Sequence, residues 1–485
     1  MKRLNRTLLS EIGTSAVAPA AAAAGEPPEK VLQFGEGGFL RAFADYMFDV
    51  LNEKGLFHGG ITVVQPIPGG MVKELAAQDG LYTLIARGLQ DGAETVQNRI
   101  ITSITKCVNP YDDFDEYIKI ADNPELRYVI SNTTEAGIAY DPDDAPGGRP
   151  QNSFPGKVTA FLHRRYERFG GDPSKGLVFL PCELIDNNGD ELKRIVTRYA
   201  REWELGVEFT EWLGTANVFA NTLVDRITPG YPRARGEDDA LCGELGYRDD
   251  LLDTCELFHF WAIEGKALER ELPFAEAGLN VVFTDDVSPY KRRKVRLLNG
   301  AHTCSVPAAF LCGIDTVGAM AADKDFSRYL RAALYGEIIP SFGSGRDGLE
   351  EFADSVIERF ANPYIEHYLL SIALNSASKF KVRVLPSILE YRRLYGAYPK
   401  ILTFSMAALI AFYKAGNRDG QPYQIADSER VFQLLRNGGT RQILGGASLW
   451  DADLTADAAF CETVDAALAD IAENGMRAAV RKLLT

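Results

Sequence analysis

The sequence predicts an α/β fold in which a parallel β-sheet covered by helices is followed by a mostly α-helical C-terminal part. Three observations support this prediction. A strand, a glycine turn, a helix and a second strand follow one another from residue 30, further short apolar runs alternate with helical stretches, and the pattern changes after residue 288. At 485 residues the chain is also too long for one hydrophobic core, so we expect at least two domains.

The first elements form a βαβ unit. The apolar run VLQF at 31–34 precedes the turn GEGG at 35–38, and the amphipathic run FLRAFADYMFDVLNEKG leads to ITVVQ at 61–65. Two further apolar runs, RYVISNTT at 127–134 and GLVFLPCEL at 176–184, are separated by helical stretches such as GKVTAFLHRRYERF. Short apolar strands that alternate with helices indicate a parallel sheet that is buried on both faces.

The glycine turn lies between a strand and a helix, the context in which such a turn binds the pyrophosphate of a dinucleotide. A glycine at position 35 allows the tight turn, one at position 37 lets the backbone approach the ligand, and the helix N-terminus favours its negative charge. The sequence therefore predicts a Rossmann-type, doubly wound domain. The residues expected to bind the cofactor at this end of the sheet are Phe34, Gly35, Gly37, Gly38, Phe39 and Gln65.

Two features depart from the usual dinucleotide fingerprint. Leu40 stands where the third glycine would fall, and the second strand ends in Gln65 instead of the acidic residue that holds a ribose hydroxyl. The choice between NAD and NADP therefore stays open on physical grounds. A tight turn that binds no ligand is the alternative interpretation of the motif.

The C-terminal part of the sequence has a different pattern. After VVFTDDVSP at 281–289 the chain consists mainly of amphipathic helical stretches with Gly and Pro breaks between them. We therefore expect a first domain at 1–288 and a mainly helical substrate or catalytic domain at 289–485. The alanine- and proline-rich run AVAPAAAAAGEPPEK suggests that residues 1–29 form a flexible tether.

Composition excludes several classes of function. With 67 acidic and 52 basic side chains the net charge is −15, which opposes general binding to nucleic acid or to an anionic membrane. The seven cysteines are odd in number and contain no CxxC pair, the five histidines show no metal-ligand spacing, and no secretory or transmembrane stretch is present. We expect a cytoplasmic monomer or small homo-oligomer that binds no metal and acts on a small molecule.

The segment KVRLLNGAHT at 294–303 follows an unusual basic cluster, KRRK, in this acidic chain. On an α-helix, Lys294, Asn299 and His302 would lie at about 0°, 140° and 80° around the axis, so they could face one cleft. A lysine that accepts a proton from an alcohol needs its pKa lowered from about 10.4 to about 7 or 8, and neighbouring cations and burial both act in that direction. The alternative is a solvated lysine, a turn asparagine and a semi-buried histidine.

KVRLLNGAH resembles the Lys-x4-Asn-x2-His signature of the polyol-specific long-chain dehydrogenases, the mannitol dehydrogenase family. The resemblance runs from about Leu4 to the C-terminus and includes FGEGGFLRAF, SNTTEAGI, LVDRITPG and the segment at 359–386. The runs VVQP and QDGLYTLIARG are similar to a branch of the family whose substrates are hexuronates. The implied substrate is therefore a sugar acid, with an uncharged polyol or another hexuronate as alternatives.

The resemblance implies zinc-independent hydride transfer with NAD. It makes Lys294 the general acid and base, places Asn299 in the oxyanion site and gives His302 a role in substrate binding. By position in the sequence, Asn188 would be a second oxyanion donor, although the lead-in CysAspAsn of the mannitol branch is CysGluLeu here. Asp225 would be a polar active-site residue that orients the substrate or its neighbours.

The resemblance also implies a substrate end and a nicotinamide side. Lys379 matches a substrate-binding lysine, whereas Ser371 stands where mannitol-type members carry an arginine. The substrate carboxylate is expected to bind Lys379, with His367, Lys381 or Arg383 as possible helpers, and the nicotinamide side is expected to be lined by Ser131 and Asn132. The alternatives are a surface lysine, a simple strand-end turn and, for the whole chain, a catalytically silent dinucleotide-binding sensor.

Overall fold

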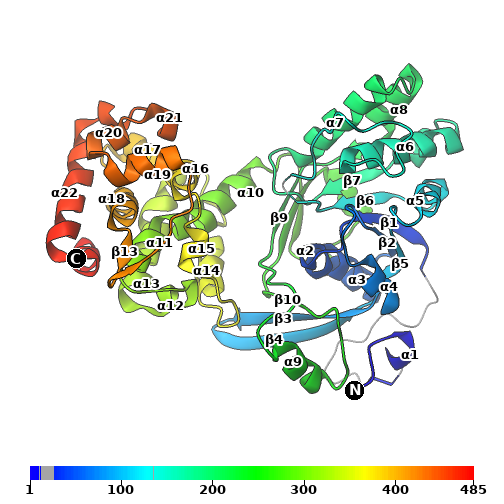
Figure 1. Ribbon diagram of the computed structural model, residues 1–485, viewed down its shortest axis with the longest axis horizontal. Coiled ribbons are helices and arrows are strands. Elements are labelled where there is room, and N and C mark those ends of the chain that lie inside the picture. Colours follow the sequence, from blue (N-terminus) through cyan, green and yellow to red (C-terminus); the bar gives the residue numbers. More distant parts are fainter. Residues whose placement is uncertain (10, 13–26, 135) are drawn as a thin grey trace. The chain divides into compact units, whose positions relative to one another are not determined.

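The computed structural model describes residues 1–9, 11–12, 27–134 and 136–485, which divide into two compact units. Unit 1 comprises Met1–Arg87 and Glu94–Val287, and unit 2 comprises Gly88–Ala93 and Ser288–Thr485. Figure 1 shows the chain coloured along its sequence.

The structure corrects the expected flexible tether at 1–29, because its first residues are folded against unit 1. Arg6–Leu9 form helix α1, and Leu4 and Leu8 are buried in a small core with Leu81, Ile100 and Tyr247. Four of these five side chains are aliphatic, so their burial explains why the segment packs onto unit 1. Residues 13–26, about half of the expected tether, lie outside the described part of the chain.

Unit 1 is built around a six-stranded sheet of order β5-β2-β1-β6-β7-β8, in which each neighbouring pair is parallel. This is the strand order of dinucleotide-binding Rossmann folds, so the predicted doubly wound sheet is confirmed. The order reverses between β1 and β6, and ligands of such sheets bind at that point, outside the carboxyl ends of the strands. The strands are β1 (Glu29–Phe34), β2 (Gly60–Val64), β5 (Ile104–Val108), β6 (Tyr128–Ser131), β7 (Val178–Pro181) and β8 (Val218–Phe219).

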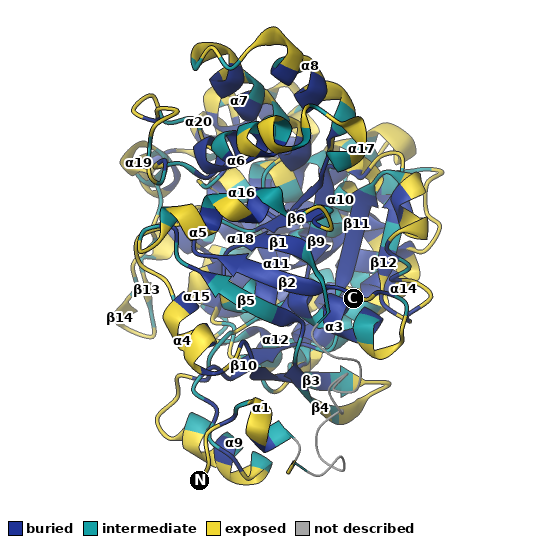
Figure 2. Cartoon of the chain, turned by 90° about the vertical axis from the view of Figure 1, so that its right-hand side faces the viewer, coloured by how far each residue is buried: buried dark blue, intermediate teal, exposed yellow. Residues whose placement is uncertain are grey.

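Both faces of this sheet are covered. Alternate residues of β1 enter two different cores: Val31 lies in one, and Leu32 and Phe34 lie in the other. The first face is covered by α2 (Gly38–Leu40), the π-helical segment η1 (Arg41–Asp45) and α3 (Tyr46–Glu53). The second face is covered by α5 (Phe114–Lys119), α6 (Phe154–Phe169), α7 (Asn188–Glu202) and α8 (Val207–Ala216). Figure 2 shows the central strands as buried.

Local sequence signals fix where these helices begin and end. In α6 the Ser153 side chain accepts a hydrogen bond from the Gly156 N–H, and Pro155 occupies the first turn, where its missing donor costs nothing. The same helix ends at Gly170, whose φ of +60° favours glycine. These signals define the 16-residue helix α6, which packs on the second face of the sheet.

Two three-stranded sheets complete unit 1. One has the order β10-β3-β4 and the other the order β12-β11-β9. Their strands are β3 (Tyr82–Gln90), β4 (Ala93–Ile101), β9 (Thr222–Asp225), β10 (Asp253–Cys255), β11 (Phe260–Glu264) and β12 (Val281–Thr284). The remaining helices of the unit are α4 (Val72–Ala77), α9 (Glu237–Leu245) and the short 3₁₀ segments η2 (Ile120–Asp122), η3 (Pro173–Lys175) and η4 (Lys266–Arg270).

Unit 2 is mostly helical, as predicted. Its centre is formed by α11 (Gly300–Leu311) and α18 (Lys400–Ala415), which pack against each other and are almost entirely buried. The segment α10 (Ser288–Arg293), the π-helical turn η5 (Lys294–Asn299) and α11 follow one another without a break. Figure 1 labels most of these helices.

The other elements of unit 2 surround this centre. They are α12 (Val317–Ala322), α13 (Lys324–Ala333), η6 (Leu334–Ile338), η7 (Pro340–Phe342), α14 (Leu349–Phe360), α15 (Leu369–Ile372), α16 (Ser376–Arg383), α17 (Leu385–Tyr395), β13 (Asn417–Arg418), β14 (Gln421–Pro422), α19 (Glu429–Asn437), α20 (Thr440–Leu444), α21 (Ala447–Trp450), η8 (Leu454–Ala456), α22 (Ala458–Asn474) and α23 (Met476–Leu483).

Three further observations concern the described residues. All seven cysteines are free thiols. No helix in this part of the chain is long and apolar enough to cross a membrane. No group of three or more His, Cys, Asp or Glu side chains there could hold a metal ion.

Candidate functional site

The glycine turn lies at the reversal point of the six-stranded sheet. Gly35 follows β1 directly and has a φ of +114°, which side chains rarely tolerate. A Cβ there would lie 3.0 Å from the carbonyl oxygen of Asn132, the residue that follows β6. The backbone of the two strand ends is joined by a hydrogen bond of 3.2 Å from the Asn132 N–H to the Phe34 oxygen. Gly35 is therefore required by the turn itself.

The other predicted residues of this turn have different roles. Gly37 is exposed, and a Cβ built on it would meet no atom within 4 Å, so its backbone is open to an approaching ligand. Gly38 instead packs closely on unit 1, since a Cβ there would lie 3.0 Å from Asp253 Oδ1. Phe34 is buried in the sheet core, and Phe39 stacks on Phe43. Only Gly37 thus combines an open surface with the helix start that a pyrophosphate needs.

A dinucleotide fits this end of unit 1. The open backbone at Gly37 precedes a continuous helical segment, Gly38–Glu53, whose N-terminus faces the reversal point. Leu40, at the third fingerprint position, fills the space against Gly35, and the wider π-helical segment η1 follows it. The departure from the fingerprint therefore changes the packing of the helix but leaves the turn open.

Gln65 is buried just beyond the end of β2, and its amide group is engaged by the next loop. Its Nε2 donates to the backbone oxygens of Ile67 at 2.9 Å and Pro68 at 3.1 Å. Beside it lies Glu36, which accepts a hydrogen bond of 3.1 Å from the Met71 N–H. A Cβ on Gly70 would meet both Glu36 and Gln65, so the three residues are in close contact. Sequence reasoning missed Glu36, although its place inside the glycine turn was a usable signal.

Burial raises the pKa of the Glu36 carboxyl, while the Met71 N–H acts in the opposite direction. The structure therefore places a carboxyl group where the second strand was expected to supply one. It comes from the turn after β1 instead of from the end of β2.

Ser131 and Asn132 lie at the carboxyl end of β6, next to the glycine turn, so they end a strand as the sequence predicted. The Ser131 hydroxyl is buried and donates to Glu183 at 3.0 Å, so its hydrogen bond is made inside the protein and not to a ligand. Glu183 also accepts from the backbone and the hydroxyl of Thr133, both at 3.0 Å. Asn132 is half-buried and donates to the Cys182 oxygen at 3.1 Å, which leaves its amide oxygen for a ligand.

Asn188 does not have the geometry of an oxyanion donor. Its side chain is buried, and Nδ2 donates to the backbone oxygens of Pro181, Glu183 and Thr222 at 2.8, 3.1 and 3.2 Å. Its Oδ1 accepts from the Gly189 and Thr222 N–H groups. Because both polar ends are already paired with backbone, the predicted role is corrected: Asn188 joins the start of α7 to β7 and β9.

Asp225 is the last residue of β9 and is buried. It lies opposite Phe260 in the ladder with β11. The next residue, Arg226, donates 2.6 Å to the Ala42 oxygen in η1 and 3.1 Å to the Glu256 oxygen. The end of β9 is therefore fastened to the helical segment that follows the glycine turn.

In unit 2 the signature residues lie on a helix that is not α-helical throughout. Lys294–Asn299 form a π-helical turn, and the Gly300 N–H donates to the Val295 oxygen, five residues before it. In such a turn, residues five apart have the relation of residues four apart in an α-helix, which share a face. The expected separation of 140° between Lys294 and Asn299 is thus wrong, and the two side chains lie closer around the axis. Residues Asn299 and His302, three apart, continue this face.

Three arginines around the start of the signature contact aromatic rings. The guanidinium groups of Arg292 and Arg296 lie over the ring of Phe342, and that of Arg293 lies over the ring of Phe352. Neighbouring helix residues point in different directions, and here aromatic rings bind the three arginines. These contacts account for the three arginines, and the action of the cluster on Lys294 stays a prediction.

His302 is buried in a polar and aromatic environment. Its ring stacks on Phe360 with centroids 4.0 Å apart and meets His367 edge-on at 5.4 Å. Burial, followed by the charges of His367 and Arg359, lowers its pKa well below the ordinary value of 6.5, so the imidazole is neutral at pH 7. Its Nε2 is buried without a hydrogen-bond partner among the described residues. Such an atom is suited to a hydroxyl of a bound substrate.

The predicted substrate-end residues are only partly brought together. Lys379 is half-buried, and its Nζ donates 2.9 Å to the Ile372 oxygen, which ties α16 to the end of α15. Ser371 is exposed on α15. Lys381 forms an ion pair of 2.9 Å with Asp451 and so points to a different partner. Half-buried His367 lies beside His302, and burial lowers its pKa as well.

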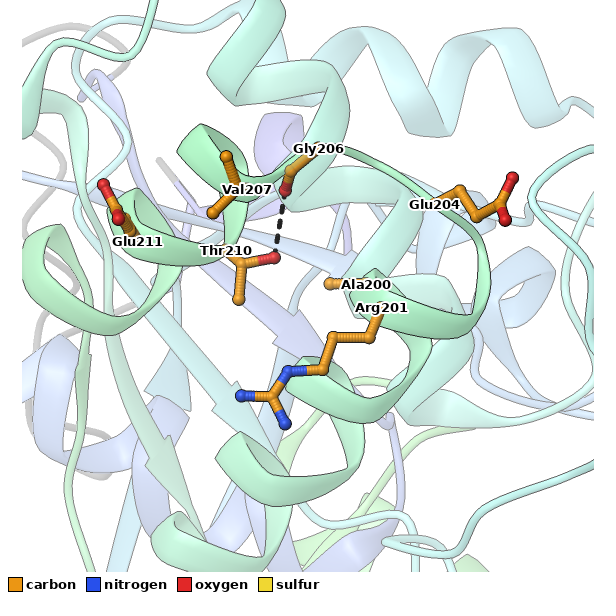
Figure 3. Close-up of a pocket in the computed structure, with 7 residues that line it drawn as sticks. All are labelled: Ala200, Arg201, Glu204, Gly206, Val207, Thr210 and Glu211. Atoms are coloured by element: carbon orange, nitrogen blue, oxygen red, sulfur yellow. Dashed lines mark hydrogen bonds between the residues drawn. The ribbon is translucent and has the colours of Figure 1, made fainter.

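A large surface cavity of unit 1 lies elsewhere. Its volume is about 580 Å³, and Figure 3 shows its lining between α7 and α8, with Thr210 Oγ1 donating 3.0 Å to the Gly206 oxygen. The lining residues are Ala200, Arg201, Glu204, Gly206, Val207, Thr210 and Glu211. Asn188 lies at the other end of α7, about 20 Å away at 1.5 Å per residue. The lining therefore contains none of the predicted site residues.

Two family models match the chain in the same order as its units. The model described as the mannitol dehydrogenase Rossmann domain matches residues 29–276, and the model described as the mannitol dehydrogenase C-terminal domain matches residues 286–472. Together they cover most of the sequence.

Curated relatives and solved structures agree with these matches. The altronate oxidoreductases of Enterobacter sp. (strain 638) and Shigella flexneri are 46% and 47% identical over 471 residues, covering 94% of this chain and 97% of theirs. A substrate-free D-sorbitol dehydrogenase has a TM-score of 0.85 at 24% identity, covering 99% of this chain and 100% of its own. Pseudomonas fluorescens mannitol 2-dehydrogenase, in a ternary complex with NAD and D-mannitol, has a TM-score of 0.73 at 24% identity, covering 99% of both chains. The two structures support the fold.

Proposed function

Because the chain belongs to the mannitol dehydrogenase family of oxidoreductases, we propose that it interconverts D-tagaturonate and D-altronate with NAD, in hexuronate catabolism. The observation that carries this choice of substrate is the similarity of 46–47% to altronate oxidoreductases over 94% of the chain. The free thiols of all seven cysteines are compatible with action in the cytoplasm.

The dinucleotide is proposed to bind at the glycine turn of unit 1. The exposed backbone of Gly37 would hold its pyrophosphate, and the half-buried Asn132 would lie on the nicotinamide side. When bound in its reduced form, the nicotinamide supplies the hydride for the keto carbon.

Residues of unit 2 are proposed to move the proton and stabilise charge. As hydride reaches the keto carbon, the Lys294 ammonium gives its proton to the keto oxygen, and the product is a secondary alcohol. Asn299 would donate an N–H to the same oxygen while it is negatively charged, because its side chain makes no hydrogen bond to any described residue. The neutral His302 would orient the substrate through a hydroxyl.

Glu36 supports NAD over NADP. Its carboxyl group lies beside Gln65, at the end of the second strand, where dinucleotide-binding folds hold the ribose 2′-oxygen. A carboxylate there can accept a hydrogen bond from a ribose hydroxyl, whereas it opposes the charge of a 2′-phosphate.

The test is an assay of NADH and NADPH oxidation by the purified protein with D-tagaturonate, D-fructuronate and D-fructose. We expect the largest kcat/KM with NADH and tagaturonate, and an unchanged rate with a chelator, because Lys294 and Asn299 would do the work of a Lewis-acid metal. Faster reduction of fructuronate or fructose would overturn the substrate. NADH binding without oxidation of any of the three would instead indicate a catalytically silent sensor.

A further inference from the structure

Positively charged and imidazole groups gather around His302 in unit 2. The charges of His367, Arg359, Arg383 and Lys379 all act on its ring, in that order of strength. His302 lies on α11, and these groups come from three other places in the chain: α14, α16 and the segment before α15. They converge because α11 packs against both α15 and α16.

Lys379 and Arg383 are not neutralised by any described carboxylate. Burial and then the charge of Arg383 lower the pKa of Lys379, while burial alone lowers that of Arg383. The Arg383 guanidinium makes no hydrogen bond or ion pair within the described part of the chain. Two cations of α16 and α17 are paired instead: Lys381 with Asp451 at 2.9 Å, and Arg392 with Asp457 at 3.5 Å.

The spacing of the two unpaired cations is unfavourable in the absence of an anion. Lys379 and Arg383 are four residues apart on α16, so they lie on one face, where like charges repel each other. Both are also partly removed from water, which adds a desolvation cost. An anion bound between them would relieve both effects.

The backbone places this pair directly beside the signature. A Cβ on Gly300 would lie 3.1 Å from the Arg383 carbonyl oxygen, so the end of α16 rests on the residue between Asn299 and Ala301. α16 also packs against the π-helical turn η5. The cation pair therefore adjoins the buried, unpartnered Nε2 of His302, which a hydroxyl of the same ligand could use.

We propose that Arg383 binds the carboxylate of the sugar-acid substrate and, with Lys379 as the second cation, makes the enzyme specific for hexuronates. The N–H donors of the Arg383 guanidinium are available for a bidentate contact, whereas the Lys379 ammonium already donates one hydrogen bond to the Ile372 oxygen. Lys381 is excluded because Asp451 holds it. This assignment rests on the proposed function.

The experiment compares two substrates in four proteins. KM and kcat are measured with NADH for D-tagaturonate and for an uncharged ketose, D-fructose, in the wild type, Arg383→Met, Arg383→Lys and Lys381→Met. Loss of a charge-assisted bidentate contact should raise KM for tagaturonate about ten- to hundredfold in Arg383→Met, with KM for fructose nearly unchanged. Arg383→Lys should recover part of the loss, and Lys381→Met, which removes a half-buried lysine that is paired with Asp451, should behave as wild type.

The outcomes separate this assignment from the proposed function. Equal changes for both substrates in Arg383→Met and Arg383→Lys would overturn the role of Arg383 alone, because the wild type would still reduce tagaturonate. A wild type that reduces fructose but not tagaturonate would overturn both. A phosphorylated ketose that outperformed tagaturonate would replace the carboxylate as the recognised group, which also refutes the assignment.

Discussion

Replacing Gly35 and Gly37 by alanine, one at a time, separates the two roles of the glycine turn. At Gly35 the φ of +114° and a Cβ only 3.0 Å from the Asn132 oxygen should together cost about 1–3 kcal/mol of stability. At Gly37 the backbone has a φ of −66°, and a Cβ would meet no atom within 4 Å, so alanine should leave stability unchanged. The same Cβ would occupy the space in front of the turn, where the pyrophosphate is proposed to approach.

The assay combines urea unfolding with a fluorescence titration of NADH. Gly35→Ala should lower the unfolding midpoint, and Gly37→Ala should keep it while weakening NADH binding about tenfold or more, which corresponds to about 1.4 kcal/mol. Gly55→Ala, at a positive φ of +67° far along the chain from the turn, controls for strain without a ligand effect. Wild-type NADH affinity in Gly37→Ala would refute the proposed place of the pyrophosphate.

Five other substitutions address the remaining site residues and one buried acid. Lys294→Met should lower kcat about 10²- to 10⁴-fold with NADH affinity retained. Asn299→Ala should lower kcat about 10²- to 10³-fold. Asn188→Ala should instead lower the free energy of unfolding by about 2–4 kcal/mol, because several buried backbone groups lose their partner. It should leave kcat of the folded enzyme nearly unchanged. Glu36→Gln should reduce the preference for NADH over NADPH several-fold, measured as the ratio of the two kcat/KM values. Burial raises the pKa of Asp45 from 3.8 to about 7, so its contribution to stability is present below 3.8 and lost as the pH rises through about 7. Unfolding midpoints measured across this range should show the loss. Asp45→Asn should reduce it but not remove it, because burial also raises the pKa values of Asp253 and Glu337 to about 7.

For each of these substitutions, a different measured result would contradict the role assigned to the residue. A full kcat in Lys294→Met would remove it from proton transfer, and a selective kcat loss in stable Asn188→Ala would restore the oxyanion role. An unchanged coenzyme ratio in Glu36→Gln would leave the choice of NAD without its structural support. A pH profile unaltered by Asp45→Asn would mean that other groups set it.

Much of the fold could be predicted because its signals are local. The strand, turn and helix at 31–55 and the apolar runs after them lie within short windows, so their period and length are enough to indicate a parallel sheet. The two small sheets were not predicted, since β10 pairs with β3 across roughly 170 residues and β9 pairs with β11 across a long insertion. The packing of Leu4 was missed for the same reason: its partners, Leu81 and Tyr247, are distant in the sequence.

The candidate site could likewise be predicted only in part from the sequence. Residue types and spacing could nominate Gly35, Lys294 and Asn299 as candidates, because these choices depend on the turn and on the helix itself, and the catalytic roles of the last two stay predictions. Spacing could not show that the Asn188 amide is hydrogen-bonded to backbone groups. Nor could it show that Lys381 is paired with Asp451 while Arg383 has no such partner among the described residues. Those distinctions depend on tertiary contacts, and a single sequence does not display them.

The π-helical turn η5 also determines where the chain length can change. A π-helical turn contains one residue more than an α-helical turn, so deleting a single residue between Lys294 and Asn299 would allow an ordinary α-helix to form there and would leave Gly300 and the residues after it in nearly the same direction relative to Lys294. A one-residue deletion within α11, between Asn299 and His302, has no extra residue to absorb it and would rotate everything after it by about 100°. Of these two neighbouring segments, only the π-helical turn can therefore lose a residue and keep the signature residues on one face.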